Sequence, residues 1–561
     1  MERSQFEVFR ERPEIPVLIA GGGINGTGLF RELALQGVDV LLVEKSDFCA
    51  GTSSASTRII HGGLRYLENG EFRLVRESLR ERNLLLRNAP HYVGPLPTTI
   101  PIFDWISGLV PAVRGFLGIE TRPGNRGALL VKAGLALYDF LAGKESGLPG
   151  HRLRSRKSAL AIRPALNPEV VSTATYYDAK ITYPERLCLE LAMDGEALFP
   201  QAHALNYVRV HEASGGTVVL RDEVSGERCA VRPRVVVNAS GAWIDLTNRG
   251  LGRESRFIGG TKGSHIVLDS PELIEAAQGE MIYFINRDGR ICIFYPFYGK
   301  IIAGTTDIPT DDPEALCDEQ EVDYILESVR QVFPTVRVDR SQVVFRFCGV
   351  RPLPRSNALT PGQISRDHSF PVLAPADGIE FPIYSLVGGK WTTFRAFAEQ
   401  VTDELLRVLG RRRIRDSANL AIGGGKEYPR AGDAFESWRD GMSKRTGLPV
   451  KRLDELIDRY GTRAEEVAGY LQAAPDKPLP HHSAYSRREI EFIVSREKVV
   501  HLDDLILRRT LMGLLGQVSR GLLDELAAIA APMLEWSPED ASAEVARAAR
   551  ILKEAHGVAL E

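Results

Sequence analysis

The chain has 561 residues, of which 44% are hydrophobic and 25% are charged. This ordinary globular composition excludes general disorder, and the length leaves room for about three or four domains of average size. The 70 basic and 73 acidic residues give a formal charge of −3. Such a balance argues against nucleic acid as the main partner, because duplex binding usually needs a basic surplus.

The cysteines and the apolar segments restrict the protein further. The six cysteines lie far apart and form no CxxC pair, so we expect reduced, mostly buried thiols and no metal site. The charged N-terminus lacks the apolar segment of a secretory signal. No uncharged apolar run reaches the roughly 18 residues that a spanning helix needs. The composition therefore predicts a cytosol-facing protein, and it leaves attachment to a membrane surface open.

The chain begins with the pattern of a βαβ unit. Residues 15–20 predict a buried strand, a glycine-rich turn and a helix to about Gln36 follow, and residues 38–43 predict a second buried strand. This start indicates a parallel sheet with helices on both faces. Further along, residues 71–88 have helical spacing. The apolar stretches within residues 101–142 are too short or too interrupted to span a bilayer.

A β-rich block follows in the middle of the chain. Asp288-Gly289 is a hairpin signal inside it, so we expect an antiparallel sheet on one side of the α/β domain. Residues 231–243 and 381–400 each predict a strand that runs into a glycine turn, and a helix follows the second turn. The strands predicted in the block cover residues 261–268, 281–286, 291–295 and 300–304.

The last part of the chain has a different character. Arg411-Arg412-Arg413 and the glycines of residues 423–425 indicate a linker after about residue 405. Nearly all of the sequence from 430 to 558 has helical periodicity. The pattern therefore predicts a helical C-terminal domain.

The first turn carries a nucleotide-binding motif. Gly21, Gly23 and Gly26 have the spacing G-x-G-x-x-G, in which the glycines serve the tight turn, the approach of a pyrophosphate and the packing of helix on strand. The helix N-terminus offers free N–H groups to the phosphates. Glu44 ends the second strand, 18 residues after Gly26, where a carboxylate can bind ribose hydroxyls. The pattern predicts dinucleotide binding, and the alternative is a purely structural glycine turn.

The stretch after Glu44 favours FAD over NAD. Residues 52–56 are small and mostly hydroxyl-bearing, and residues 61–68 read HGGLRYLE. Small residues and glycines shortly after the second strand suit a long cofactor that threads through the protein. The alternative is a solvent-exposed loop rich in small residues.

At these residues the chain resembles the FAD-dependent glycerol-3-phosphate dehydrogenase family of the aerobic, respiratory type. The resemblance covers most of the chain, and HGGLRYLE is its most specific part. The resembling segments are GGGINGTG at 21–28, TSSASTRIIHGGLRYLENGEFRLVRESLRER at 52–82, VNASGAW at 237–243, TKGSHIVL at 261–268, GTTD at 304–307, GVRPL at 349–353, GGKWTTFR at 388–395, SRREIEF at 486–492 and EKVVHLDDLILRRT at 497–510.

The resemblance implies an α/β fold with three units. An FAD-binding Rossmann-like domain of the glutathione-reductase or D-amino-acid-oxidase type would carry an inserted antiparallel β substrate domain, and an all-α C-terminal domain would follow. The expected ranges are 1–100, 150–245 and 345–410 for the discontinuous FAD-binding domain, 246–344 for the β-rich substrate or cap domain, 411–561 for the helical domain, and 101–149 for an apolar insertion that would serve as a membrane or interface element. Within this insertion, residues 101–128 are longer and more aromatic than is usual in the family.

The resemblance also implies the site residues. Arg351 matches the substrate-site arginine of the family, and His61 matches its flavin-proximal histidine; we expect Arg351, His265, His61 and Lys390 to be catalytic. The implied substrate-binding residues are Arg65, Tyr66, Arg351, Lys390 and Thr306. The implied cofactor-binding residues are Gly21, Gly23, Asn25, Gly26, Glu44, Thr52, Ser53, Ser54, His61, Gly62, Ser240, Gly241, Gly389, Lys390, Trp391 and Thr392.

The chemistry of these residue types agrees with the implied site. A phosphomonoester carries nearly two negative charges, for which arginine offers a bidentate fork and lysine a point charge. Alcohol oxidation also needs a base for the hydroxyl proton, and we leave His61, His265 and a bound water open. A helix that begins near Trp391 would direct its N-terminus at the flavin. The structural alternatives are a strand-end ion pair for Arg351 and a core position for His265.

The resemblance implies the oxidation of sn-glycerol 3-phosphate to dihydroxyacetone phosphate by hydride transfer to FAD. Electrons would pass to a membrane quinone, and the enzyme would be peripheral on the cytoplasmic face of the membrane and would form a homodimer. The alternatives are an oxidase that uses oxygen, a related amine or amino-acid oxidase, and a flavoprotein that binds a partner without turnover. Residues 101–142, with Phe103, Trp105 and Phe116, would contact either the membrane or another protein.

Overall fold

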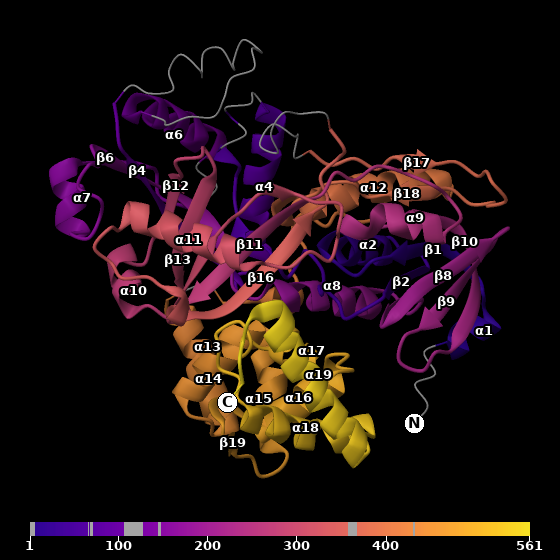
Figure 1. The fold of residues 1–561 in the computed structure, drawn as a ribbon. Helices are drawn as coiled ribbons and strands as arrows, with labels where there is room; N and C mark the ends of the chain where they lie inside the picture. The colour runs from indigo at the N-terminus through magenta and orange to yellow at the C-terminus, as the bar shows by residue number, and fades with distance from the viewer. Residues whose placement is uncertain are drawn as a thin grey trace.

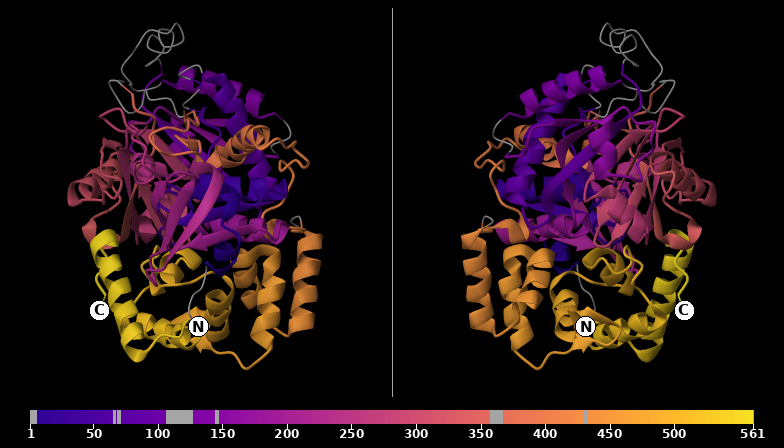
Figure 2. Two further views of the ribbon diagram at one scale, coloured as in Figure 1. Left: turned by 90° about the vertical axis from the view of Figure 1, so that its right-hand side faces the viewer. Right: turned by 90° about the vertical axis from the view of Figure 1, so that its left-hand side faces the viewer.

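The computed structural model describes residues 6–64, 67, 71–105, 127–143, 147–356, 367–429 and 432–560. Two β-sheets with their covering helices form the larger part of the molecule, and the helical C-terminal region forms a smaller part beside it (Figure 1). The turned views in Figure 2 show the same division. This arrangement confirms the predicted α/β fold with a helical C-terminal domain.

The first sheet contains the predicted βαβ unit. Its parallel strands β1, β2, β7, β10 and β18 lie in the order β18-β10-β1-β2-β7, and β1 is buried almost throughout, as expected for a parallel strand. The strands are β1 (Glu14–Ala20), β2 (Val40–Glu44), β7 (Ala202–Asn206), β8 (Val208–Ser214), β9 (Thr217–Asp222), β10 (Arg228–Asn238), β17 (Val372–Leu373) and β18 (Ile383–Ser385).

Long helices cover only one face of this sheet, whereas the sequence pattern predicts helices on both faces. Three helices pack on that face: α2 (Ile24–Leu35), α8 (Pro184–Leu198) and α12 (Phe394–Val408). Each contributes buried apolar side chains to this contact, for example Leu29, Leu189 and Val401. On the other face, Leu18 and Leu41 pack against β8, β9 and the short helix α1 (Glu7–Glu11). The reason is that β10 continues beyond the sheet and pairs with β9 as an antiparallel ribbon.

The second sheet is larger than the predicted β-rich block. Its order is β15-β11-β14-β13-β12-β4-β6-β3, with β16 beside β11 and β5 beside β6. The four predicted strands are present, and β11 and β14 have the predicted ends. The strands are β3 (Ile59–Ile60), β4 (Val93–Ile102), β5 (Arg152–Ser155), β6 (Ser172–Ile181), β11 (Thr261–Leu268), β12 (Met281–Ile285), β13 (Ile291–Phe297), β14 (Lys300–Gly304), β15 (Ile308–Pro309) and β16 (Val343–Arg351).

Five of these strands lie outside the range 246–344 that we expected for the substrate domain, or extend beyond it. The strands β4 and β6 pair over ten residues each, and β4 also pairs in parallel with β12. The strand β16 pairs with β11 over its whole length. The sheet is therefore built from three separated parts of the chain, and the β-rich region shares its sheet with segments that we expected in the FAD-binding part.

Three groups of helices complete the fold. The helix α4 (Phe72–Asn88) was predicted, and α6 (Ala128–Ala142) packs on it far from the C-terminal region (Figure 1). The sheet region also has α7 (Arg156–Ile162), α9 (Ile244–Gly250), α10 (Pro271–Ala277) and α11 (Glu319–Val332). The C-terminal region has α13 (Asp433–Thr446), α14 (Val450–Tyr460), α15 (Ala464–Gln472), α16 (Arg487–Arg496), α17 (Leu502–Asp504), α18 (Arg520–Leu534) and α19 (Pro538–His556), and a small hairpin of β19 (Pro478–Leu479) and β20 (His482–Ser486).

Two further predictions concern thiols and membrane spans. All six cysteines are free, and all except Cys348 are buried, which confirms the prediction of reduced, mostly buried thiols. Among the described residues, no helix combines the length and the apolar character needed to cross a bilayer.

Candidate active site

A cavity of about 660 Å³ lies at the carboxyl ends of the central parallel strands. Ala20, Val43 and Ala239 line it at the ends of β1, β2 and β10. In open α/β sheets, ligands bind at this edge, where the strand order reverses. The cavity continues past residues 50–55 and reaches the end of β16.

The glycine motif leaves no room for side chains at the entrance to α2. A Cβ atom at Gly26 would lie 1.8 Å from the carbonyl oxygen of Gly21, and one at Gly21 would lie 2.6 Å from that of Ala239. Gly21 also has φ +116°, a conformation that favours glycine. Turn, helix and β10 are thus in backbone contact, and the N-terminus of α2 is exposed to the cavity for an anionic group.

Glu44 lies beside this turn and lines the cavity. Its carboxylate accepts hydrogen bonds from the backbone N–H groups of Gly22 at 2.6 Å and Ser46 at 2.9 Å. Burial raises the pKa of Glu44, although both hydrogen bonds act in the opposite direction. Each carboxylate oxygen keeps a second lone pair, so the group can still accept hydrogen bonds from a ligand hydroxyl.

The segment around Trp391 connects the glycine turn with the loop after β2. The amide of Asn25 donates to the carbonyl oxygen of Gly388 at 3.3 Å, and the Trp391 indole donates to that of Ser53 at 2.9 Å. The Oδ1 atom of Asn25 is buried and has no hydrogen-bond partner within the described part of the chain. This oxygen is available to accept a hydrogen bond from a bound molecule or an ordered water.

Lys390 and Thr392 lie in the same segment, at the start of the 3₁₀ turn η5 (Trp391–Thr393) that leads into α12. The helix therefore begins where the sequence predicts it. The Thr392 hydroxyl donates to the carbonyl oxygen of His61 at 3.3 Å, and the Lys390 ammonium donates to the Ser78 hydroxyl of α4 at 3.3 Å. The first bond holds the segment against the loop that contains His61, and the second holds it against α4.

Arg351 ends β16 next to the cavity. Its guanidinium donates to Asp307 at 3.1 Å and to the Thr305 hydroxyl at 3.0 Å. It also covers the backbone of Gly263 so closely that a Cβ atom there would lie 2.0 Å from Nη2. The adjacent residues Gly349 and Val350 line the cavity. Arg351 itself is not among the residues that line the cavity, and its guanidinium is held beside this strand end by neighbours from β11 and the turn after β14.

His265 lies on β11 and is almost completely buried. Its ring stacks on Phe347 at 4.9 Å, and its Nε2 atom hydrogen-bonds the Thr57 hydroxyl at 3.1 Å. Burial, and to a smaller extent the charge of Arg351, lowers the pKa of His265 to about 3. The imidazole is therefore neutral near pH 7 and is a weak base.

Some of the expected residues have other roles or lie elsewhere. The buried Thr306 hydroxyl accepts from the N–H of Ser264 at 2.9 Å and donates to Glu321 at 2.6 Å, so it joins β11 to α11 and does not project to a ligand. Arg65 and Tyr66 lie outside the described residues. Of the expected cofactor-binding residues, the cavity is lined by Gly21, Gly23, Asn25, Glu44, Thr52, Ser53, Ser54, Ser240, Gly241, Gly389 and Trp391, but not by Gly26, His61, Gly62, Lys390 or Thr392.

Sequence reasoning missed one wall of the cavity. Asp503, Arg508 and His556 from the C-terminal helical region line it together with Phe345. The His556 ring stacks on Phe345 at 4.2 Å, and its Nδ1 atom hydrogen-bonds the carbonyl oxygen of Arg346 at 3.0 Å. The recognisable segment at 497–510 was the only available signal, and its position in the sequence does not show which surface it meets.

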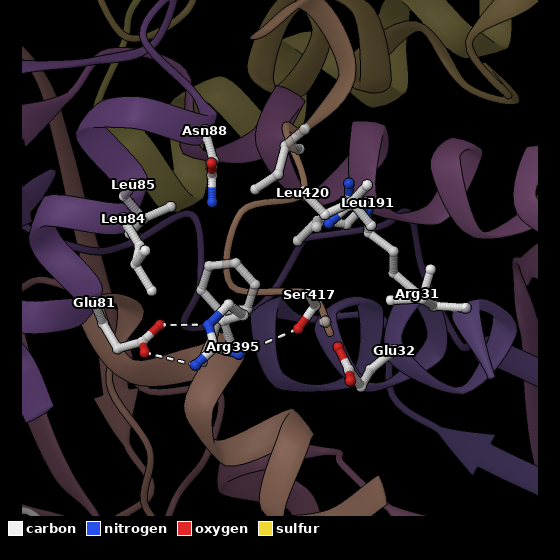
Figure 3. A pocket seen from close by; sticks show the side chains of 14 residues that line it. Arg31, Glu32, Glu81, Leu84, Leu85, Asn88, Leu191, Arg395, Ser417 and Leu420 are labelled. Atoms are coloured by element: carbon white, nitrogen blue, oxygen red, sulfur yellow. Dashed lines mark hydrogen bonds and ion pairs between the residues drawn. The ribbon is translucent and has the colours of Figure 1, made fainter. Parts of the chain in front are cut away.

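A second, much smaller cavity lies between α2, α4 and α12 (Figure 3). Glu81 and Arg395 form a bidentate ion pair there at 2.7 and 2.8 Å, and Arg395 also donates to the Ser417 hydroxyl at 3.1 Å. The volume of about 20 Å³ is close to that of a single water. This cavity is a junction between helices and too small for a substrate.

Comparisons with known proteins agree with this geometry. Residues 16–381 match the model of the FAD-dependent oxidoreductase family, and residues 416–541 match the model of the C-terminal domain of alpha-glycerophosphate oxidase. A glycerol-3-phosphate dehydrogenase from Synechocystis is 35% identical, and the match covers 89% of this chain and 90% of that protein. A probable mitochondrial glycerol-3-phosphate dehydrogenase from Dictyostelium discoideum is 30% identical over 96% of this chain and 84% of its own.

The chain belongs to the FAD-dependent glycerol-3-phosphate dehydrogenase family. The predicted resemblance is thereby confirmed, and so is FAD as the cofactor. The fold agrees as well, because the solved structure of a glycerol-3-phosphate dehydrogenase from Bacillus halodurans has a TM-score of 0.72. That match covers 97% of this chain and 96% of the other at 22% identity.

The residues at the cavity fit FAD. The backbone at the glycine turn carries no side chains where Cβ atoms would clash, and the Oδ1 atom of Asn25 is available to accept a hydrogen bond from the cofactor. Glu44 can accept hydrogen bonds from ribose hydroxyls, and the N-terminus of α2 suits the pyrophosphate. We therefore expect Gly21, Gly23, Asn25, Glu44 and the loop of residues 51–55 to hold the cofactor in this family member.

Proposed function

We propose that this family member oxidises sn-glycerol 3-phosphate to dihydroxyacetone phosphate. The position of Arg351 carries the proposal, because this residue bears a guanidinium and lies between Val350 and Pro352, which line the FAD cavity. A guanidinium binds a phosphomonoester through paired, charge-assisted hydrogen bonds. The named relatives from Synechocystis and Dictyostelium support the same substrate.

The chain's own residues would bind the substrate and move a proton. Arg351 would hold the phosphate, and Lys390, from the segment that follows Gly389, would add a second positive charge. Oxidation removes a hydride from the carbinol carbon and a proton from its hydroxyl, and FAD, when bound, supplies the hydride acceptor. Because the pKa of His265 is about 3, that residue is poorly suited to take the proton near pH 7. His61 is the remaining histidine candidate, and a bound water is the alternative.

Anaerobic reduction of the bound flavin tests this function. The purified holoenzyme is mixed without oxygen with glycerol 3-phosphate, glycerol, other phosphorylated polyols, and an amino acid. We expect bleaching of the flavin absorbance by glycerol 3-phosphate at much lower concentration than by any other compound. Faster bleaching by the amino acid would contradict the proposal and favour the amine or amino-acid oxidase alternative.

We further propose that the electron acceptor is a quinone in the membrane, to which the enzyme binds peripherally on the cytoplasmic side. Two electrons and two protons would convert the quinone to the quinol. The support is the outer face of α6, where Leu129, Leu137 and Phe140 are exposed, Phe140 to 79%. Trp105, which is 57% exposed, precedes this helix in the described chain and accepts a hydrogen bond from the N–H of Leu129 through its carbonyl oxygen.

The exposed residues of α6 form a surface that suits contact with a bilayer. Apolar and aromatic side chains on one face of a helix favour an interfacial position at a bilayer.

The electron acceptor is tested by adding oxygen or a short-chain quinone to the substrate-reduced enzyme. We expect rapid reoxidation by the quinone; rapid release of hydrogen peroxide without quinone would instead identify an oxidase.

A further inference from the structure

The loop that follows Glu44 is held from outside the sheet by the C-terminal helical region. Ser46 and Ala50 of this loop line the FAD cavity, and Asp47 between them is completely buried. The loop is fixed to the glycine turn, because the N–H of Cys49 donates to the carbonyl oxygen of Gly22 at 3.0 Å. A displacement of Asp47 would therefore also move the backbone of residues 46–50, which forms part of the cavity wall.

The partners of Asp47 come from the π-helical turn η8 (Leu505–Arg509). Arg508 Nε donates to Oδ2 of Asp47 at 2.7 Å, while Arg509 Nη1 and Nη2 donate to Oδ2 and Oδ1 at 2.6 and 2.9 Å. Asn206 adds a fourth hydrogen bond at 3.1 Å. The two arginines are 461 and 462 residues away in sequence, so only the folded helical region can supply them.

The two arginines are themselves rigidly placed. Arg508 also binds Asp503 at 2.8 Å and makes a short ion pair with Asp504, and Arg509 Nε donates to the carbonyl oxygen of Glu497 at 2.9 Å. Arg508 lines the FAD cavity directly, as Leu507 does. A wider π turn allows two consecutive side chains to converge on one carboxylate, and such turns occur often at functional sites.

We propose that Asp47, clamped by Arg508 and Arg509, makes the docked helical domain part of the FAD site, so that FAD binding and domain docking strengthen each other. In this role the arginines are positioning residues: they hold the loop of residues 46–55, which meets the cofactor. Coupling of this kind is reciprocal, because whatever helps the second event after the first must help the first after the second. Bound FAD should therefore also tighten the docking of the helical domain.

The first test measures FAD affinity in full-length variants. Asp47→Asn keeps the shape of the side chain and removes its charge, and Arg509→Met removes the bidentate partner. We expect the dissociation constant of FAD, from fluorescence titration of the apoprotein, to rise about 10-fold or more in both. Arg509→Lys keeps the charge and should give an intermediate value. Substituting both residues should cost less than the sum of the two single effects, because they share one interaction.

Arg547→Met is the matched control. Arg547 donates to Asp503 at 2.9 Å, so it belongs to the same charged cluster but does not contact Asp47. We expect its FAD dissociation constant to remain within about two-fold of the original. Folded Asp47→Asn and Arg509→Met variants that bind FAD as tightly as the original protein would overturn the proposal.

A second measurement decides the matter even if these variants do not fold. Hydrogen exchange of the unmodified protein is compared with and without FAD. We expect FAD to slow exchange in residues 46–55 and also in α16 (Arg487–Arg496), which belongs to the helical domain and does not line the cavity. Protection confined to the residues that line the cavity, with unchanged exchange in α16, would show that docking of the helical domain is not coupled to the cofactor.

Discussion

Arg351 occupies space that only a glycine at position 263 leaves open. We expect Arg351→Ala to lower turnover of glycerol 3-phosphate by about 100-fold or more, because a charge-assisted bidentate contact to the substrate is lost. FAD should remain bound, since the glycine turn and Glu44 are untouched. Steady-state rates and the flavin spectrum measure both effects. The control is Arg346→Ala on the same strand, where the side chain pairs with Glu319 instead; equal losses in both variants would contradict the assignment.

His265 makes the stability of the protein depend on pH. Its pKa is about 3 in the folded state and about 6.5 when unfolded, so the unfolded state takes up the proton first. The stabilising contribution is complete above about pH 6.5 and is lost as the pH falls toward 3. Between about pH 7 and pH 5 this amounts to about 2 kcal/mol.

We therefore expect His265→Gln to show a smaller loss of stability on acidification than the original protein. The measurement is the free energy of unfolding by denaturant at several pH values, with and without added FAD. A variant whose stability falls as steeply as that of the original protein would assign the pH dependence to other groups. The free energy of unfolding at pH 7 alone does not test the prediction, because the variant loses the stack on Phe347 and is less stable at every pH.

At the level of residues, the sequence predicts contacts that are local and misses those that are distant. The glycine turn and Glu44 were predicted from spacing, because one βαβ unit brings them together. The clamp of Arg508 and Arg509 on Asp47 had no local signal, since its members are more than 460 residues apart. The hydrogen bonds of the Thr306 hydroxyl with Ser264 and Glu321 likewise depend on strand pairing that the sequence does not show.

The outer face of α6 supplies a prediction about a whole element. A double change of Leu137 and Phe140 to serine should weaken binding to phospholipid vesicles by about 10-fold or more, because burial of one such side chain contributes about 1.5–3 kcal/mol. Sedimentation with vesicles measures the bound fraction. Ile414→Ser is the control, because Ile414 is 66% exposed on the linker before the helical domain.

The alternative occupant of the α6 face is another protein chain, including a second copy of this one. Unchanged vesicle binding in the double variant, together with a smaller mass in solution, would identify α6 as a contact between copies. Unchanged values in both measurements would remove α6 from either role.

Element boundaries were predictable where one strand or helix carries its own pattern. The ends of β11 and β14 agree with the prediction, and α12 follows the glycine turn as expected. The composition of the second sheet was not predictable, because β4 and β6 join it through pairing with each other and with β12. Nothing in the sequence of a strand specifies its neighbour when the partners lie far apart in the chain.

Buried ion pairs connect the sheet region of the molecule to the C-terminal helical region. Arg186 of α8 donates to Glu497 of the C-terminal region at 2.9 and 2.6 Å, and both side chains are almost fully buried. Arg186 lowers the pKa of Glu497, against the effect of burial. We expect Glu497→Leu to destabilise the protein by about 3–5 kcal/mol, because it leaves a buried guanidinium without its charged partner.

Thermal unfolding with and without FAD measures this effect. The control is Asp524→Leu, which removes an exposed pair with Arg520 on α18 and should cost less than about 1 kcal/mol. If Glu497→Leu loses no more stability than the control, apolar packing is the main interaction that holds the sheet region and the C-terminal helical region together.

At the level of the whole molecule, length and motifs predicted the classes of structural unit but not their contacts. The sequence showed an FAD-binding part, a β-rich part and a helical part. It did not show that the helical part forms a wall of the FAD cavity through Arg508 and His556. That contact follows from how the finished domains pack, which depends on surfaces assembled from many segments.

The opposite placement of α6 and the helical domain has a practical consequence (Figures 1 and 2). With α6 resting on a bilayer, the C-terminus points to the aqueous side. A fluorescent label near the end of α19 (Pro538–His556) should then stay accessible to a water-soluble quencher and remain insensitive to a quencher dissolved in lipid. The same geometry makes the C-terminal end the better place to immobilise the enzyme on an electrode or bead, since α6 then stays free to meet lipid.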